Sequence, residues 1–170
     1  MHRRTQLRRT PSIGDPGTGA FAIAVAAVLD ATGTWAPLAA LHSTAVEVVA
    51  IVMALAGFAA AECAVAAMAE TWRVGVDTAE PVRLVTTGPF ALVRNPVYTG
   101  LIVTMLGITL MVANLVAILG WVTLVAGLEL QVRLLEEPYL RGLHETDFDM
   151  HAAHVGRFVP GLGRKPARAA

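Results

Sequence analysis

The chain has 170 residues, of which 55% are hydrophobic and 15% charged, and its 13 basic and 13 acidic residues give a formal net charge of zero. Soluble domains usually carry about 25% charged residues, so this composition argues against a soluble domain and favours one compact membrane domain. The basic residues form no stripe interleaved with aromatic residues, so we expect no nucleic-acid partner. The single cysteine, Cys63, excludes an intrachain disulfide.

The N-terminal arm, residues 1–17, is basic and precedes a long apolar run. This arrangement superficially resembles a secretory signal peptide. The apolar run is interrupted at Asp30, Gly33 and Pro37, however, and further apolar stretches follow it. We therefore expect an uncleaved first anchor at residues 18–41, either as a spanning helix or as a broken or re-entrant one.

Lysine and arginine are missing from two long intervals of the sequence. A helix needs about 20 apolar residues to cross a membrane, so the first interval holds the anchor and a second span at residues 45–69. The second interval predicts a helical hairpin, residues 97–135, with arms at 97–112 and 115–135 and a turn at Asn114.

These four spans predict an all-α polytopic membrane protein. They place every cation on one side of the membrane, as the positive-inside rule requires, so both termini should be cytosolic. The polar loop 70–96 and the C-terminal segment 136–170, which looks helical, then lie on the cytosolic side. The loop is too long for a simple connector, and loops of this kind often carry function.

The small residues of the second and third spans are spaced so that helix backbones can approach closely in lipid. We expect them to pack helices within one protomer rather than to form a dimer seam. They are Ala54, Gly57 and Ala61 in the second span and Gly100, Thr104 and Gly107 in the third.

The start of the third span predicts an anion site. Asn95 followed by Pro96 is typical of an N-cap and a first helical position, so the helix should begin at Pro96. Its free amides and the neighbouring Arg94 would attract a carboxylate or phosphate. Tyr98 can reach the same region with its hydroxyl, and Gly100 keeps that face open. The alternative is an ordinary interfacial loop with a snorkelling arginine and a belt tyrosine.

Two adjacent carboxylates, Glu136 and Glu137, precede Pro138 and are expected to end the fourth span. Acidic residues at a helix C-terminus oppose the helix dipole, and an unfavourable local choice can mark a site. The alternative is that both face water at the membrane exit, paired with Arg133 or Arg141.

Residues 88–100, GPFALVRNPVYTG, together with Glu136 and Glu137, resemble the isoprenylcysteine carboxyl methyltransferase family, whose wider relatives include phospholipid N-methyltransferases. The resemblance covers residues 71–161. It implies an integral membrane enzyme that uses S-adenosylmethionine and takes a lipophilic acceptor from the bilayer, with the acceptor left open between a carboxylate and an amine.

The resemblance also implies the site residues, with Glu136 and Glu137 closing the cofactor pocket and Arg94, Tyr98 and Arg157 as the catalytic candidates. The residues expected to bind the cofactor are Arg94, Asn95, Pro96, Tyr98, Gly100, Glu136 and Glu137.

The chain departs from the family pattern at several positions. Asn95 stands where many members have histidine, in the form that resembles bacterial relatives. The tail has Phe148 and His151 where relatives often have a pair of tyrosines, which puts a tail contribution to catalysis in doubt. Arg157 remains a candidate because it keeps its place before Phe158. Three tail histidines lack the spacing of a metal motif, so no metal is expected.

Other functions remain open at this stage. The enzyme could methylate a phospholipid or another small lipid at nitrogen or oxygen, or resemble steroid reductases and bind a nicotinamide. A non-enzymatic membrane subunit or transporter would instead use Asp30 and Glu62, which should face the bundle interior, an interface or a watery cleft. Abundant alanine and arginine with a single lysine suggest a GC-rich bacterial source and its inner membrane, where prenylated protein tails are unexpected. The sequence gives no oligomeric state.

Overall fold

The computed structural model describes residues 16–31, 38, 43–73 and 84–165. Most of the predicted arm 1–17, with its arginines, lies outside the described residues, as do Gly33 and Pro37. The described chain is helical, which confirms the predicted all-α class, and it holds no named strand.

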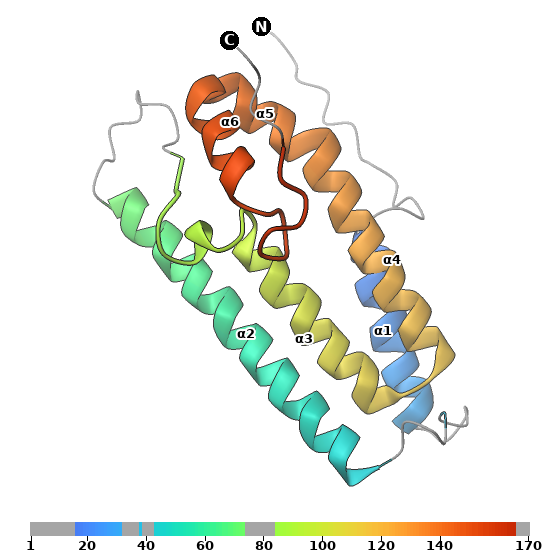
Figure 1. The fold of residues 1–170 in the computed structure, drawn as a ribbon. Coiled ribbons are helices and arrows are strands. Elements are labelled where there is room, and N and C mark those ends of the chain that lie inside the picture. The colour runs from blue at the N-terminus through green and yellow to red at the C-terminus, as the bar shows by residue number, and fades with distance from the viewer. Residues whose placement is uncertain (1–15, 32–37, 39–42, 74–83, 166–170) are drawn as a thin grey trace, which may run out of the picture.

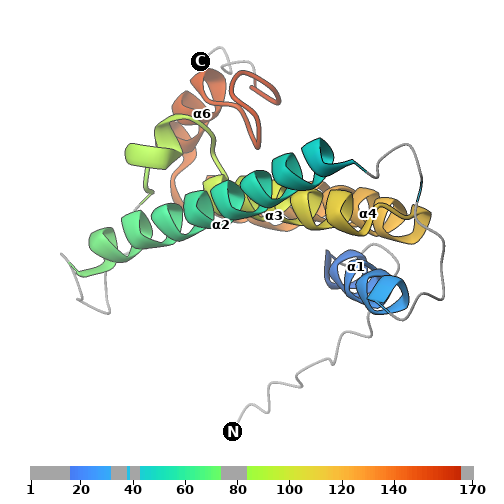
Figure 2. The same ribbon diagram turned by 90° about the horizontal axis from the view of Figure 1, so that it is seen from below.

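Four long helices run side by side, and two short helices fold over one end of them (Figure 1). Viewed along another direction, α2 lies against α3 on one side and α1 lies against α4 on the other (Figure 2). The helices are α1 (Pro16–Ala31), α2 (Thr44–Arg73), α3 (Pro96–Val112), α4 (Leu115–Gln131), α5 (Glu137–Leu143) and α6 (Glu145–His154).

Two of the helical segments are long and apolar enough to cross a membrane, namely Thr44–Met68 and the continuous run Leu115–Leu143. Large apolar side chains of α2 such as Leu55 and Phe58 are exposed on the isolated chain. Apolar surface of this extent marks a membrane or partner contact, because water does not favour it. Pro96–Val112 is a shorter apolar helix, so spanning by α1 and α3 stays a prediction.

The first predicted span is not one continuous helix over residues 18–41. α1 is described as far as Ala31, and Leu38 is not helical; instead its backbone N–H donates to the carbonyl of Ala113 at 2.8 Å. Glycine and proline both disfavour a helix interior, and this sequence carries one of each between residues 31 and 38. The second helix, by contrast, continues past residue 69 to Arg73.

The predicted helical hairpin is confirmed in its arms and its turn. α3 begins at Pro96 and α4 at Leu115. Between them Asn114 is buried, and its Oδ1 accepts from the N–H of Ala117 at 2.9 Å, which caps α4. Its Nδ2 donates to the carbonyl of Ala26 at 3.4 Å and so ties α1 to the turn.

The predicted packing of small residues within one protomer is also confirmed. A Cβ added to Gly57 of α2 would lie 2.5 Å from the backbone N of Thr104, and one added to Gly107 would lie 2.5 Å from the carbonyl oxygen of Ala50. A Cβ on Gly100 would meet the carbonyl oxygen of Gly57 at 2.6 Å. We call this line of backbone contact between α2 and α3 the glycine seam.

Candidate functional site

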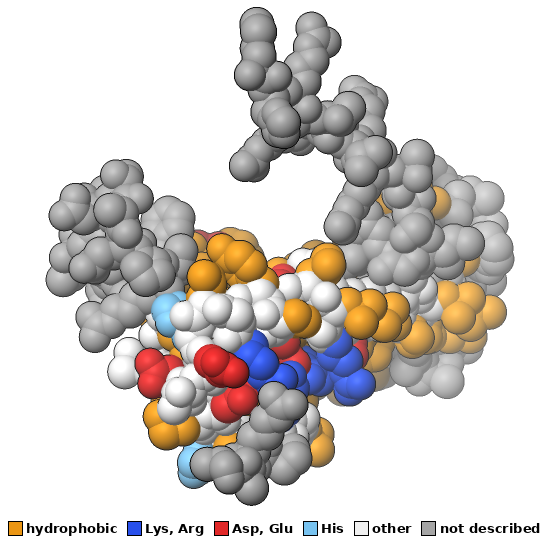
Figure 3. Space-filling model, turned by 90° about the horizontal axis from the view of Figure 1, so that it is seen from above, with side chains coloured by type: hydrophobic (Ala, Val, Ile, Leu, Met, Phe, Trp, Pro, Cys, Tyr) orange, Lys and Arg blue, Asp and Glu red, His pale blue; other side chains and the backbone are white. Residues whose placement is uncertain are grey.

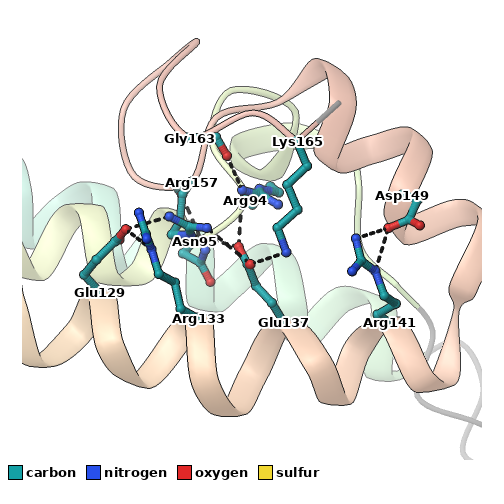
Figure 4. Close-up of polar contacts among 10 residues, drawn as sticks. All are labelled: Arg94, Asn95, Glu129, Arg133, Glu137, Arg141, Asp149, Arg157, Gly163 and Lys165. Carbon is teal, nitrogen blue, oxygen red and sulfur yellow. Dashed lines mark hydrogen bonds and ion pairs between the residues drawn. The ribbon is translucent and has the colours of Figure 1, made fainter. Parts of the chain in front are cut away.

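A buried charge cluster lies where α5, the segment before α3 and the C-terminal segment meet (Figure 4). At its centre is Glu137, which is only 4% exposed to solvent. Its Oε1 accepts from Arg157 Nε at 2.8 Å and lies 3.2 Å from Arg94 Nη2, while its Oε2 lies 2.5 Å from Lys165 Nζ. One carboxylate therefore holds three cations, and we call these four residues the Glu137 cluster.

Glu137 reaches this position because the helix does not end before Pro138, contrary to the sequence expectation. A π-helical turn, Val132–Glu136, joins α4 to α5, and the N–H of Glu137 donates to the carbonyl of Val132. A π turn widens the helix by one residue and is frequent at functional sites; here it accommodates a proline, which has no N–H to donate. The two glutamates therefore lie within a helix rather than at its C-terminus.

The C-terminal segment that supplies Arg157 runs alongside the segment before α3. Val93 and Gly156 form an isolated parallel bridge. The N–H of Arg94 donates to Gly156 O at 2.8 Å, and Arg94 Nη2 donates to Gly163 O at 2.6 Å. These bonds bring together Arg94 and Arg157, which the sequence separates by 63 positions.

Asn95 occupies the predicted cap position, but its side chain does not cap α3. Its Nδ2 donates to the carbonyl of Arg157 at 3.4 Å, and its backbone N–H donates to the same oxygen at 3.1 Å. The predicted N-cap position of Asn95 is thus confirmed, but its side chain holds the C-terminal segment and makes no capping bond. Pro96 is the buried first residue of the helix.

Tyr98 and Glu136 form a second polar group beside the cluster. The Tyr98 hydroxyl donates to Glu136 Oε1 at 2.6 Å. Gln131 Nε2 donates to the Tyr98 hydroxyl oxygen at 3.1 Å and to Glu136 Oε1 at 2.9 Å. The two adjacent glutamates therefore have different partners, with Glu136 bound to neutral groups and Glu137 to cations.

A cavity of about 400 Å³ opens beside these groups, within the usual range for small-molecule sites. Its polar lining includes four of the predicted site residues, Arg94, Asn95, Glu136 and Glu137. Its walls are apolar, from Val65, Met68, Leu84, Val85, Phe90, Val132, Leu140 and Phe148.

The other predicted site residues have different places. Tyr98 and Arg157 touch the lining glutamates without being among the lining residues. Gly100 belongs to the glycine seam and faces α2, so it provides close packing below the cavity rather than an open face toward it.

Arg94 carries the most unusual electrostatics of the site. Its Nε and Nη1 atoms are buried and have no hydrogen-bond partner in the described structure, and its guanidinium lies 6.0 Å from the centre of the Phe148 ring. Burial lowers the pKa of Arg94 from its ordinary value, whereas hydrogen bonding to Glu137 raises that of Arg157. Buried donors without partners are rare in folded proteins, so Arg94 is prepared to bind an acceptor such as a carboxylate.

Sequence reasoning missed several members of the site. Glu129 accepts from Arg157 Nη1 at 2.6 Å, and Gln131 and Lys165 complete the two polar groups. A signal was present, since Glu129 and Gln131 are polar residues within an apolar helix and Lys165 is the only lysine.

The carboxylates considered for transport are not part of this site. Glu62 is exposed on α2 and does not face the bundle interior, which was one of the three places expected for it. A position at an interface or in a watery cleft stays a prediction. The side chain of Asp30 lies outside the described residues.

The three tail histidines, His144, His151 and His154, line a second cavity. No group of three metal-ligating side chains occurs within the part of the chain that the structure describes.

Charged side chains of both signs gather at this end of the bundle, with apolar side chains around them (Figure 3). Residues 45–147 match the phospholipid methyltransferase family, and they include α3, α4, the π turn and both glutamates. The chain therefore belongs to the phospholipid methyltransferase family, whose members are membrane methyltransferases that act on lipid-like substrates. No curated protein and no solved structure matches the chain significantly.

Proposed function

We propose that this protein is an integral membrane methyltransferase that binds S-adenosylmethionine in the 400 Å³ cavity and methylates a lipophilic acceptor from the bilayer. The observation that carries the proposal is the pair of unpartnered buried donors on Arg94, beside two carboxylates at the polar end of apolar helices.

The residues present fit the charges of this cofactor. S-adenosylmethionine has a carboxylate, an ammonium and a sulfonium group. Arg94 would bind the carboxylate through Nε and Nη1, Glu136 would offset the positive groups, and the apolar wall near Phe90 suits an adenine ring. Tyr98 would fix Glu136 in place, and Arg157 would act on the site through Glu137.

The bound cofactor supplies an activated methyl group for an in-line displacement. The protein then has to align the acceptor, exclude water and hold the cofactor charges. An acceptor carboxylate, as in an isoprenylcysteine, needs no base, whereas the amine of a phospholipid headgroup must first lose a proton. Both acceptors are compatible with the family.

The test is calorimetric titration of S-adenosylmethionine and S-adenosylhomocysteine into the purified protein in lipid nanodiscs. We expect micromolar binding by the wild type, and an affinity about 10-fold to 100-fold lower for Arg94→Lys, which keeps the charge and loses the planar fork. Arg133→Lys is the matched control, because the Arg133 side chain is exposed and pairs only with Glu129 in the described structure.

Two results would contradict the proposal. Folded wild-type protein that binds neither compound excludes the cofactor assignment, and binding of a nicotinamide instead would favour a reductase. Equal affinity in Arg94→Lys and Arg133→Lys would remove Arg94 from the site.

We also propose that the charged end faces the cytosol in a bacterial inner membrane. Every described lysine and arginine lies at the end of the bundle that holds α5 and α6, which supports this orientation. In a Cys63→Ala background, a membrane-impermeant maleimide should label Ser43→Cys in intact cells, and label Glu145→Cys only in inverted vesicles. The opposite pattern would reverse the orientation.

A further inference from the structure

His151 of α6 stands between two cavities. It lines the 400 Å³ cavity together with Arg94 and the two glutamates. It also lines a second cavity of about 520 Å³, whose other walls are Leu84, Thr86, His144, Asp147, Met150 and His154. The second cavity reaches solvent, since Asp147, Met150 and His154 are exposed. Of the two residues that line both cavities, His151 and Leu84, only His151 can carry a proton.

The imidazole is available for proton transfer. It is partly buried, and its ring makes no hydrogen bond to any described residue. Burial lowers the pKa of His151 from its ordinary value of 6.5, and the nearby positive charge of Arg94 lowers it further. The ring is therefore neutral at pH 7 and can accept a proton.

The charged groups around His151 come from every side of the two cavities. Arg94 precedes α3, and Glu136 and Glu137 belong to the π turn and α5. Asp147 and His154 belong to α6, and His144 directly precedes that helix. Burial is the main cause of the lowered pKa of His151, and among these charged groups Arg94 adds to it. The arginine that carries the unpartnered donors therefore also favours the neutral ring.

The carboxylates of the site have other roles. Glu137 is held by three cations, which makes it a poor proton acceptor. Glu136 accepts from Tyr98 and Gln131 through Oε1, and it is the carboxylate proposed above to offset the positive groups of the cofactor. Beside these carboxylates and the cationic Arg94, His151 is the remaining ionisable side chain that lines the first cavity.

We propose that His151 is the general base of this enzyme and that the acceptor is the amine of a lipid headgroup; this inference rests on the proposed function. An alkylammonium gives one proton to the imidazole, and the resulting amine attacks the methyl carbon. A nitrogen–carbon bond forms, the carbon–sulfur bond breaks, and its electron pair stays on the neutral thioether product. The methylated ammonium carries the positive charge that leaves sulfur, and the proton on His151 passes to water through the second cavity.

A carboxylate acceptor would need no general base. Its oxygen attacks as an anion and releases no proton, so His151 would have no proton to accept. His151 lies between the mainly apolar first cavity and the solvent-exposed second cavity. This position therefore favours nitrogen over oxygen as the methylated atom.

The experiment measures methyl transfer from labelled S-adenosylmethionine to phosphatidylethanolamine in nanodiscs, with N-acetyl-S-farnesylcysteine as the carboxylate probe. For the amine lipid, wild-type kcat should rise with pH through a pKa below 6.5 and then level off. His151→Gln should lower kcat at pH 7 by about 100-fold or more and abolish that limb. Its affinity for S-adenosylhomocysteine should stay within about twofold, which separates loss of a base from loss of folding.

Glu145→Gln is the matched control, because Glu145 lies on the same helix and lines neither of these two cavities. A readout without turnover is the proton NMR titration of the histidine ring, assigned by its loss in His151→Gln. The resonance of His151 should titrate below pH 6.5 and shift when S-adenosylhomocysteine binds.

The outcomes distinguish the two proposals. If the wild type binds no cofactor and methylates neither probe, the proposed function fails and the inference with it. If the wild type methylates the amine and His151→Gln keeps its kcat, or if only the carboxylate probe is methylated, the inference alone is overturned. A titration of His151 above pH 6.5 would also overturn it.

Discussion

The start of α3 and the body of the same helix are fixed by opposite means. Along the glycine seam, α3 meets α2 because side chains are missing, so that backbone atoms occupy the space a Cβ would need. At its N-terminus, α3 is held by side chains that carry charge, since Arg94 belongs to the Glu137 cluster. The seam should therefore be sensitive to added size, and the Glu137 cluster to removed charge. The following substitutions test that contrast, in order of decreasing effect.

Glu137→Ala should have the largest effect. It leaves Arg94 buried without an anion and Arg157 with Glu129 alone, and removing one partner of a buried ion pair costs about 3–5 kcal/mol. The free energy of unfolding, measured by SDS titration in mixed micelles, should fall by that amount. Glu145→Ala, at an exposed position of α6, is the control and should change little. A loss below about 1 kcal/mol for Glu137→Ala would show that the cluster does not hold the end of α3.

Gly57→Val should have the next largest effect. Its Cβ would lie 2.5 Å and 2.7 Å from backbone atoms of Thr104 and Gly100, which cannot move aside as a flexible side chain can. Overpacking of this kind costs about 1–3 kcal/mol. The same SDS titration measures it, with Gly142→Ala as the control, since a Cβ there meets nothing within 4 Å. Equal stability of the two variants would contradict the seam.

Asn114→Ala tests the buried N-cap of α4, at the end of the bundle opposite the Glu137 cluster. It removes the acceptor for the N–H of Ala117 at the start of α4, so stability should fall by about 1 kcal/mol. Asn114→Ser retains a capping oxygen and loses only the longer bond to Ala26. Thermal unfolding followed by circular dichroism compares them. If serine is as destabilising as alanine, the bond to α1 is the more important contact.

Arg133→Ala should have the smallest effect, although its bond to Glu129 is short, at 2.6 Å. The Arg133 side chain is 59% exposed, and exposed i,i+4 pairs contribute about 0.3–0.5 kcal/mol. Glu129 also keeps Arg157 as a partner. Thermal unfolding should therefore be nearly unchanged, and a large loss would mean that burial does not decide the value of a charge here.

Local chemistry predicted much of this fold, because its signals act over a few residues. The start of α3 at Pro96 and the turn at Asn114 follow from residues that adjoin them, and the glycine seam follows from a spacing of three and four positions. For the site, local chemistry indicated an anion site at Arg94 and marked the two glutamates, and only the family resemblance pointed to Arg157. No local pattern specifies the contacts among these residues.

What the sequence did not predict depends on contacts between distant segments. The Asn95 side chain looked like a cap, and only the return of the C-terminal segment gives it Arg157 as a partner. Pro138 looked like a helix end, because a local reading does not foresee a π turn that lets a helix continue through proline. Lys165 reaches Glu137 only after α6 has folded over the bundle.

The π turn has a further consequence for how this region tolerates change in length. The turn Val132–Glu136 already takes up one surplus residue, so inserting a second residue there, with α-helix after it, should rotate α5 by about 100° relative to α4. Such an insertion would turn Glu137 away from its three cations without altering any of the four side chains. The register of one helix is therefore as much a part of this site as the identity of its residues.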